Sequence, residues 1–304
     1  MNYLIIDIGS NTVKYDLFSC IDDGPAIKLG HRSTALRLIN HICDGRLSKE
    51  GLALLCGTLE EYKADARKAD AQVFPFATAS LRRIKEPFAV IDAVKEKTGL
   101  EIVLLSGDEE AECSFLGMCA TLKSLPKTAF MADMGGGSTE LNLFEECKSL
   151  YLYSCPFGAL SVKNAAGVSD AMTAKERQAA EDYVRALLPQ RLSAFGEGGK
   201  TAVLVGGTGK ACRTLAKELL KIKKADALTR EEFSALLDLV TDPKKKHFEK
   251  MKKLVPQRYQ LMGAGLAAFD AIFKEAGVER ILICPGGIRD GYLTRLRQKN
   301  APKE

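Results

Sequence analysis

The sequence predicts a mixed α/β fold built from two copies of one domain. A hairpin motif carries this prediction: an apolar strand runs into an aspartate, a tight glycine turn, hydroxyl residues and a second apolar strand. The motif occurs over residues 7–12 and again over residues 133–140. After each copy the chain alternates between strand-like and helix-like apolar patterns. Hairpin strands followed by alternating helices and strands are typical of a mixed sheet with helices on its faces.

The first half of the chain shows this order most clearly. Strands are expected near residues 3–8, 13–20, 26–32, 72–77 and 101–104, and helices near residues 52–69, 87–97 and 108–119. A short polar break at residues 124–127 (Ser-Leu-Pro-Lys) then interrupts the pattern. We therefore expect a first domain over residues 1–124.

The second half restarts the pattern and predicts a domain over residues 125–290. Strands are expected near residues 128–133, 140–145, 149–155, 202–205 and 280–284. Thr173 with Glu176, and Thr229 with Glu232, have the spacing of capping boxes that open helices. A helix is expected over residues 211–220, and a basic helix of about residues 291–304 is a candidate to pack back on the first domain.

Composition excludes several classes of protein. The 304 residues are 46% hydrophobic and 27% charged, as in ordinary globular proteins, and no run of about 20 apolar residues suggests a membrane span. The first strand begins at once, without a signal-type segment, so a cytoplasmic location is expected. Nine scattered cysteines indicate reduced thiols. The net charge of +5 lies mostly in lysine runs of the second half, which fit a solvated helix face or a track for a polyanion. No nucleic acid is expected, because aromatic interleaving is absent.

Phosphate binding is the chemistry that suits the two hairpins. Glycines let backbone N–H groups approach an anion, and Ser10, Thr12, Ser138 and Thr139 add hydroxyl donors. An aspartate at each strand end is a hard oxygen ligand, suited to Mg²⁺ or to orienting a water. One hairpin alone would be as consistent with an ordinary glycine turn, whereas two with the aspartate in the same place favour a phosphate clamp.

Several segments resemble one enzyme family. They are residues 7–12 (DIGSNT), 77–82 (ATASLR), 105–111 (LSGDEEA), 133–140 (DMGGGSTE), 206–208 (GGT) and 286–291 (GGIRDG). The arrangement resembles the actin, Hsp70 and sugar-kinase superfamily, and within it the exopolyphosphatase and guanosine pentaphosphate phosphatase (Ppx/GppA) family. The resemblance implies two ribonuclease-H-like (actin-like ATPase) domains, each with a mixed five-stranded sheet flanked by helices, around an interdomain cleft. It also implies a homodimer.

The resemblance implies roles for the acidic residues. Glu110 matches the general base that activates water, with Glu109 as the runner-up. Asp133 and Glu140 match further catalytic acids, and Asp7, Asp133 and Glu140 are the expected ligands of Mg²⁺ or Mn²⁺. The expected phosphate-binding residues are Gly9, Ser10, Asn11, Thr12, Arg82, Gly135, Gly136, Gly137, Ser138, Thr139, Gly207, Thr208 and Arg258.

The resulting functional prediction is a Mg²⁺-dependent exopolyphosphatase that releases terminal orthophosphate from inorganic polyphosphate. Guanosine pentaphosphate 5′-phosphohydrolysis is the alternative with the same chemistry, and the sequence does not separate the two substrates. A small-molecule kinase of the same superfamily and a non-catalytic sensor of a phosphorylated ligand are further alternatives. The Glu109-Glu110-Ala111 segment argues against the kinase, and the retained acidic set argues against the sensor.

Overall fold

The structure is a computed structural model that describes residues 1–21, 24–169, 172–189, 192, 200–242, 244 and 246–300. Residues 301–304 of the expected terminal helix lie outside this part. The chain forms two compact units, which are described separately: unit 1 is Met1–Glu110 with Tyr292–Glu304, and unit 2 is Ala111–Gly291. The domain boundary expected between residues 124 and 125 stays a prediction. None of the described helices is long and apolar enough to cross a membrane.

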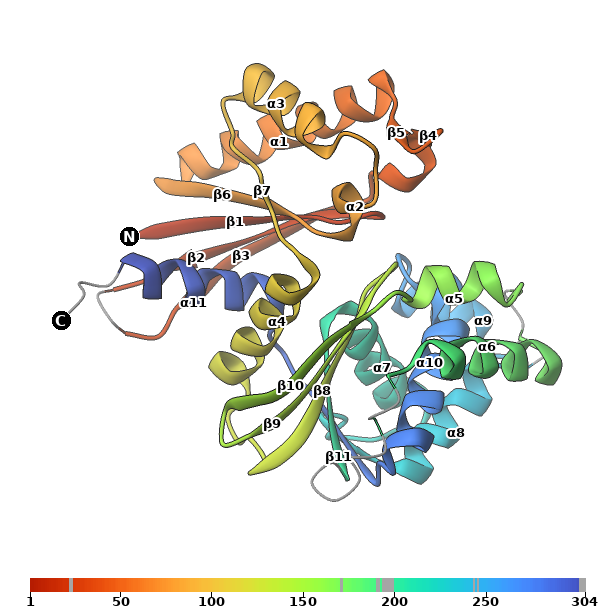
Figure 1. Cartoon of the computed structure of the whole chain (residues 1–304). Helices are drawn as coiled ribbons and strands as arrows, with labels where there is room; N and C mark the ends of the chain where they lie inside the picture. Colours follow the sequence, from red (N-terminus) through yellow and green to blue (C-terminus); the bar gives the residue numbers. More distant parts are fainter. Residues whose placement is uncertain are drawn as a thin grey trace. The chain divides into compact units, whose positions relative to one another are not determined.

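Unit 1 contains the expected five-stranded mixed sheet. Its strand order is β3 (Ile27–Thr34), β2 (Val13–Ser19), β1 (Asn2–Ile8), β6 (Ala71–Ala77) and β7 (Val103–Leu104). The three hairpin strands pair antiparallel, whereas β1, β6 and β7 pair parallel (Figure 1). The carboxyl ends of β1, β6 and β7 therefore meet at one edge, and this edge positions the functional residues of unit 1.

Helices cover both faces of this sheet. On one face Leu4 and Ile6 of β1 pack with Leu55 and Leu59. The other helices and short strands of unit 1 before residue 107 are η1 (Leu38–His41), β4 (Ile42–Cys43), β5 (Arg46–Leu47), α1 (Lys49–Lys68), α2 (Ala79–Arg82) and α3 (Pro87–Thr98). On the opposite face the ring of Phe76 lies 4.6 Å from that of Tyr292 in α11 (Ile288–Asn300).

Unit 2 repeats the topology of unit 1 with one strand added. Its order is β10 (Lys148–Cys155), β9 (Thr139–Glu145), β8 (Thr128–Met134), β11 (Thr201–Val205), β13 (Arg280–Ile283) and β12 (Ala227–Thr229). The strand pairs again run antiparallel in the hairpin and parallel beyond it. The sheet has six strands instead of the expected five, because β12 pairs antiparallel with β13 at the edge. Three residues are too few to show a strand period in sequence.

The two faces of the unit 2 sheet are covered unequally. On one face Phe115 and Met118 of α4 (Gly107–Thr121) pack against Met131, Phe144 and Val203. The other face is covered by α5 (Ala159–Ala165), α6 (Ala174–Leu187), α7 (Gly206–Leu219), α8 (Arg230–Val240), α9 (Phe248–Leu254) and α10 (Tyr259–Ala276). The capping boxes predicted at Thr173 and Thr229 open α6 and α8, so both predictions are confirmed.

Glycines let α4 pass close to the chain around the start of α11. A Cβ on Gly117 would lie 2.0 Å from the carbonyl oxygen of Gly287 and 2.9 Å from the nitrogen of Gly291. A Cβ on Gly291 would lie 1.7 Å from the carbonyl oxygen of Cys113. Such distances leave no room for a side chain, so these glycines set the position of α4 within unit 2.

Candidate functional site

Backbone hydrogen bonds stabilise the first hairpin turn, residues 9–12. The Gly9 N–H donates to the carbonyl of Thr12 at 3.1 Å. The carbonyls of Ser10 and Asn11 accept from the N–H groups of Ile39 (3.1 Å) and Arg37 (2.9 Å). Carbonyls used in this way point away from any anion over the turn, and the side chains of residues 10–12 stay partly exposed. The predicted turn of unit 1 is therefore formed.

The second hairpin turn repeats this construction. The Gly135 N–H donates to the carbonyl of Ser138 at 2.9 Å, in the same relation as Gly9 to Thr12. The carbonyls of Gly135 and Gly136 accept from the first N–H groups of α5, at 3.0 Å each. Gly158 makes this possible, because a Cβ there would lie 2.6 Å from the Gly135 carbonyl oxygen.

The predicted phosphate donors of the second turn differ in what they do. The Thr139 hydroxyl donates to the carbonyl of Phe157 at 2.7 Å, and its side chain is fully buried. The Thr139 hydroxyl thus links the first residue of β9 to the backbone of Phe157. Ser138 is also buried, while Gly135, Gly136 and Gly137 are partly exposed. The exposed part of this turn is accordingly its glycine backbone.

Asp133 is fixed from two sides at the carboxyl end of β8. The Ser114 hydroxyl of α4 donates to Asp133 Oδ2 at 2.7 Å, and both side chains are buried. On the other side, Gly206 has a φ of +74°, and a Cβ there would lie 2.0 Å from Asp133 Oδ1. The carboxylate therefore occupies space that only a glycine at position 206 leaves open.

Glu140 lies directly opposite Asp133 in the β8–β9 register. Directly opposed residues of antiparallel strands point to the same face of a sheet. Glu140 is 2% exposed and accepts a hydrogen bond from the Ser154 hydroxyl at 3.1 Å. Burial, and then the charge of Glu140, raise the pKa of the neighbouring Cys155 thiol. Two buried carboxylates thus share one face, which is a donor set that suits a hard cation.

A second group of predicted residues gathers beside this pair in unit 2. The Thr208 hydroxyl donates to the carbonyl of Met134 at 3.0 Å, and Arg258 Nη1 lies 3.3 Å from the same hydroxyl. A Cβ on Gly207 would lie 2.1 Å from Arg258 Nη2, so the guanidinium packs directly against this glycine. The structure therefore brings Gly207, Thr208 and Arg258 together at the carboxyl edge of β8 and β11.

In unit 1 the predicted base and a predicted phosphate ligand form an ion pair. Arg82 Nη2 donates to Glu110 Oε2 at 2.9 Å, and Arg82 Nη1 donates to the carbonyl of Leu105 at 2.8 Å. The side chains are 26% and 12% exposed. Asp7 lies at the same sheet edge, since it is in register with Phe76 near the end of β6.

Glu109 makes different contacts. The Ser106 hydroxyl accepts from the Glu109 N–H at 3.1 Å, and Glu109 Oε2 accepts from the Ser106 N–H at 2.9 Å, which is a capping box. Its other oxygen accepts from Arg295 Nη2 at 2.6 Å. The hydrogen bond from the Ser106 N–H, and then the Arg295 guanidinium, lower the pKa of Glu109.

Comparison with known proteins identifies the family. Residues 26–300 match the model of the Ppx/GppA phosphatase family. The chain belongs to the Ppx/GppA phosphatase family. Among curated relatives, Exopolyphosphatase 1 of Mycobacterium tuberculosis is 23% identical over 299 residues, which cover 96% of this chain and 87% of the relative.

Solved structures of Ppx/GppA proteins share the fold. An exopolyphosphatase from Cytophaga hutchinsonii superposes with a TM-score of 0.88 at 18% identity, covering 98% of both chains. A Ppx/GppA family member from Aquifex aeolicus superposes with a TM-score of 0.83 at 23% identity, covering 100% of this chain and 99% of the other. The resemblance stated from sequence and the predicted fold class are thus confirmed.

Sequence reasoning missed three residues that contact the candidate acids, Ser114 and Gly206 in unit 2 and Arg295 in unit 1. Ser114 lies four residues after Glu110 and so shares its helix face, a spacing that could have indicated a partner for a buried acid. Gly206 opens the glycine-rich run whose later members were assigned to phosphate. Arg295 had no local signal, because it lies far along the chain from Glu109.

Proposed function

We propose that this Ppx/GppA protein hydrolyses the terminal phosphoanhydride bond of inorganic polyphosphate, with Glu110 as the general base. The pairing of Glu110 with Arg82 is the observation that carries the proposal. It places an acceptor for a proton beside a cation that suits a phosphate. The M. tuberculosis and C. hutchinsonii relatives are both named exopolyphosphatases, which supports the choice of substrate.

The proposed step is an attack by water on the terminal phosphorus. Glu110 takes a proton from the water while the water oxygen bonds to phosphorus. The bond from phosphorus to the bridging oxygen breaks. The electron pair leaves on the shortened chain, and orthophosphate is released. Glu110 suits this role better than Glu109, whose two oxygens are engaged by Ser106 and Arg295.

Charge on the phosphates has to be balanced during transfer, chiefly by positioned cations and N–H groups. Arg82 and Arg258 would supply guanidinium groups, and the glycine turns would supply N–H donors. Asp133 and Glu140 fit a divalent cation, Mg²⁺ or Mn²⁺, since both are buried carboxylates on one sheet face, and Asp7 is the third expected ligand. Such a cation would neutralise phosphate charge. Within the described residues no three acidic, cysteine or histidine side chains form a metal-binding group.

The first test is phosphate release from polyphosphate of defined lengths, with Mg²⁺ and after its removal by EDTA. Glu110→Gln should lower kcat on the order of 10²- to 10⁴-fold, the usual contribution of a general base. Glu109→Gln is the matched control, and should lower the melting temperature through its capping role while keeping most of the rate. Equal rates for wild type and Glu110→Gln would refute the assignment of the base.

A parallel assay with guanosine pentaphosphate decides between the two substrates. A higher kcat/KM on polyphosphate supports the proposal, and a higher value on guanosine pentaphosphate replaces its substrate while keeping its chemistry. ADP formation from ATP that requires an added acceptor would favour the kinase alternative. The homodimer and the cytoplasmic location expected from sequence remain part of the proposal.

A further inference from the structure

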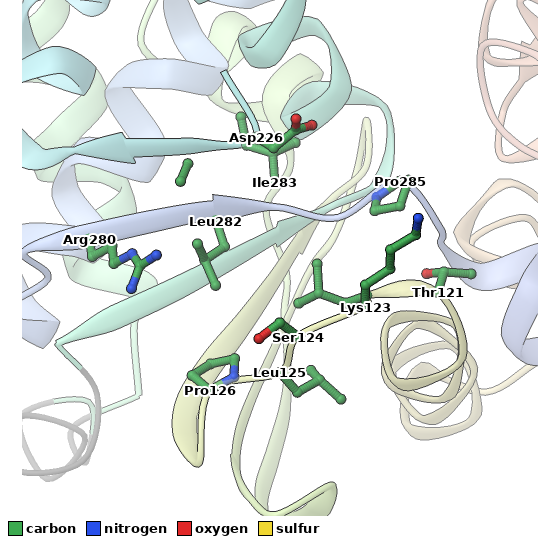
Figure 2. A pocket seen from close by; sticks show the side chains of 12 residues that line it. Thr121, Lys123, Ser124, Leu125, Pro126, Asp226, Arg280, Leu282, Ile283 and Pro285 are labelled. Atoms are coloured by element: carbon green, nitrogen blue, oxygen red, sulfur yellow. The ribbon is translucent and has the colours of Figure 1, made fainter. Parts of the chain in front are cut away.

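A pocket in unit 2 contains none of the residues of the candidate site. Its volume is about 530 Å³, and it lies between the segment that joins α4 to β8 and the strands β13 and β12, of which β12 is the edge strand (Figure 2). Small-molecule sites in proteins commonly have volumes of about 300–1,000 Å³. The pocket therefore has room for a small organic ligand.

The pocket forms where α4 stops covering the sheet. Leu122, Leu125 and Leu282 are only partly buried, and they pack at the margin of the core cluster under α4. Pro126 and Pro285 complete an apolar lining. An apolar group that entered here would be removed from water against side chains that are already half-buried, which is favourable.

Two cationic side chains stand on this apolar lining. Lys123 comes from the segment after α4, and Arg280 begins β13. Figure 2 shows Arg280 and Leu282 on the side of β13 that faces the segment carrying Ser124 and Pro126. The lining thus combines two positive charges and the hydroxyls of Thr121 and Ser124 with an apolar surface.

The acidic groups near these cations are already paired with other residues. Asp226 is the acidic residue of the lining, and its Oδ1 accepts from Arg213 Nε at 2.5 Å. Glu279, next to Arg280 in sequence, accepts from Lys200 Nζ at 2.8 Å. Among the residues that the structure describes, neither Lys123 nor Arg280 forms a salt bridge. The lining therefore carries a net positive charge, since its one acidic side chain is paired with Arg213 from outside the lining.

We propose that this pocket binds a small anion with an apolar body, such as an alkyl phosphate or an alkanoate. A guanidinium can hold a phosphate or carboxylate with two parallel hydrogen bonds, and an ammonium adds a point charge. Arg280 binds the anionic head, Lys123 adds positive charge at the opposite end of the pocket, and Leu122, Leu125 and Leu282 contact the apolar body (Figure 2). This inference does not depend on the proposed hydrolase reaction, because it uses none of its residues.

Fluorescence titration with 8-anilinonaphthalene-1-sulfonate tests the site, because this probe joins a sulfonate to an aromatic body. The wild type should show saturable binding, and the double variant Lys123→Ala/Arg280→Ala should bind at least about 10-fold more weakly. The control variant Lys252→Ala/Lys253→Ala removes two exposed charges from α9 and should bind like the wild type. All four substituted residues are exposed, so circular dichroism melts should agree among the three proteins.

Competition then defines the ligand chemistry. Hexyl phosphate and hexanoate should displace the probe, and the stronger of the two identifies the preferred head group, whereas inorganic phosphate should not displace it at the same concentrations. Equal affinity of the probe for the two double variants would overturn the proposal. So would displacement by inorganic phosphate alone, because the apolar lining would then contribute nothing.

Discussion

Gly206→Ala should displace Asp133 from its hydrogen bond with Ser114. The expected loss in the free energy of unfolding follows from two features of Gly206. The residue has a φ of +74°, and a Cβ in this left-handed region costs about 1–2 kcal/mol. The added Cβ would also lie 2.0 Å from Asp133 Oδ1. To reach ordinary van der Waals separation the carboxylate has to move by more than about 1 Å. That movement breaks the 2.7 Å hydrogen bond from Ser114, and an unsatisfied buried group adds about 1–3 kcal/mol.

Gly277→Ala is a matched control for the backbone contribution. Gly277 follows α10 with a φ of +70°, and nothing lies within 4 Å of a Cβ built there. We therefore expect Gly277→Ala to lower the free energy of unfolding by the strain alone, about 1–2 kcal/mol. Gly206→Ala should lower it by roughly 2–5 kcal/mol, because the displaced carboxylate adds to the strain.

The two variants should differ more in rate than in stability. A displacement of about 1 Å in an active site can lower the rate on the order of 10²-fold. Chemical denaturation gives the free energies, and phosphate release from polyphosphate gives kcat at a temperature where both variants stay folded. Full activity in Gly206→Ala, or an equal loss in Gly277→Ala, would show that the position of Asp133 does not matter for the reaction.

Two further substitutions test the packing of unit 2, and a third, in α1 of unit 1, serves as a control. Burial opposes the ionisation of Asp270, yet hydrogen bonds from Lys274 and Arg230 outweigh it and lower the pKa. Its contribution to stability is therefore present above the unfolded value near 3.9 and is lost as the pH falls through the folded pKa. Asp270→Asn should cost about 3–5 kcal/mol at pH 7, and urea titrations should show the difference from wild type shrinking below about pH 4. Gly117→Ala should lower the free energy of unfolding by roughly 1–3 kcal/mol, because its Cβ would overlap the backbone of Gly287 and Gly291. Gly57→Ala should raise it by about 0.5–1 kcal/mol, because Gly57 is in helix α1 and its Cβ would meet nothing within 4 Å. Equal melting temperatures for the two variants would contradict this account.

The parts of the fold that sequence predicted are those set by local patterns. The two hairpins follow from an aspartate and glycines between apolar strands, and the capping boxes at Thr173 and Thr229 follow from residue spacing. Helix α10 was not predicted, because its central residues, Ala264–Phe273, are buried on every side and leave no polar face to mark a helix in the sequence. The edge strand β12 was missed because three residues carry no pattern.

The residues of the candidate site also differ in whether local sequence could predict their role. The sequence identified the residues at the strand ends, since chemistry and position coincide there. It assigned the Thr139 hydroxyl to phosphate, whereas the structure turns that hydroxyl toward the Phe157 carbonyl. Which way such a hydroxyl points depends on a backbone carbonyl from another segment. Sequence spacing alone does not contain that information.

The difference between Glu109 and Glu110 shows how helix geometry can separate two adjacent acids. Successive residues of an α-helix point about 100° apart, as 3.6 residues per turn require. Ser106 precedes α4, so the residue three positions later reaches back to the Ser106 N–H, and this position is Glu109. Glu110 is then turned away from the cap and toward Arg82, which lies at the end of α2. A Ser106→Gly substitution would remove the hydroxyl half of the cap but would leave this angular relation intact. The assignment of the base to Glu110 therefore depends on its place in the first helical turn, one residue after the position that closes the cap.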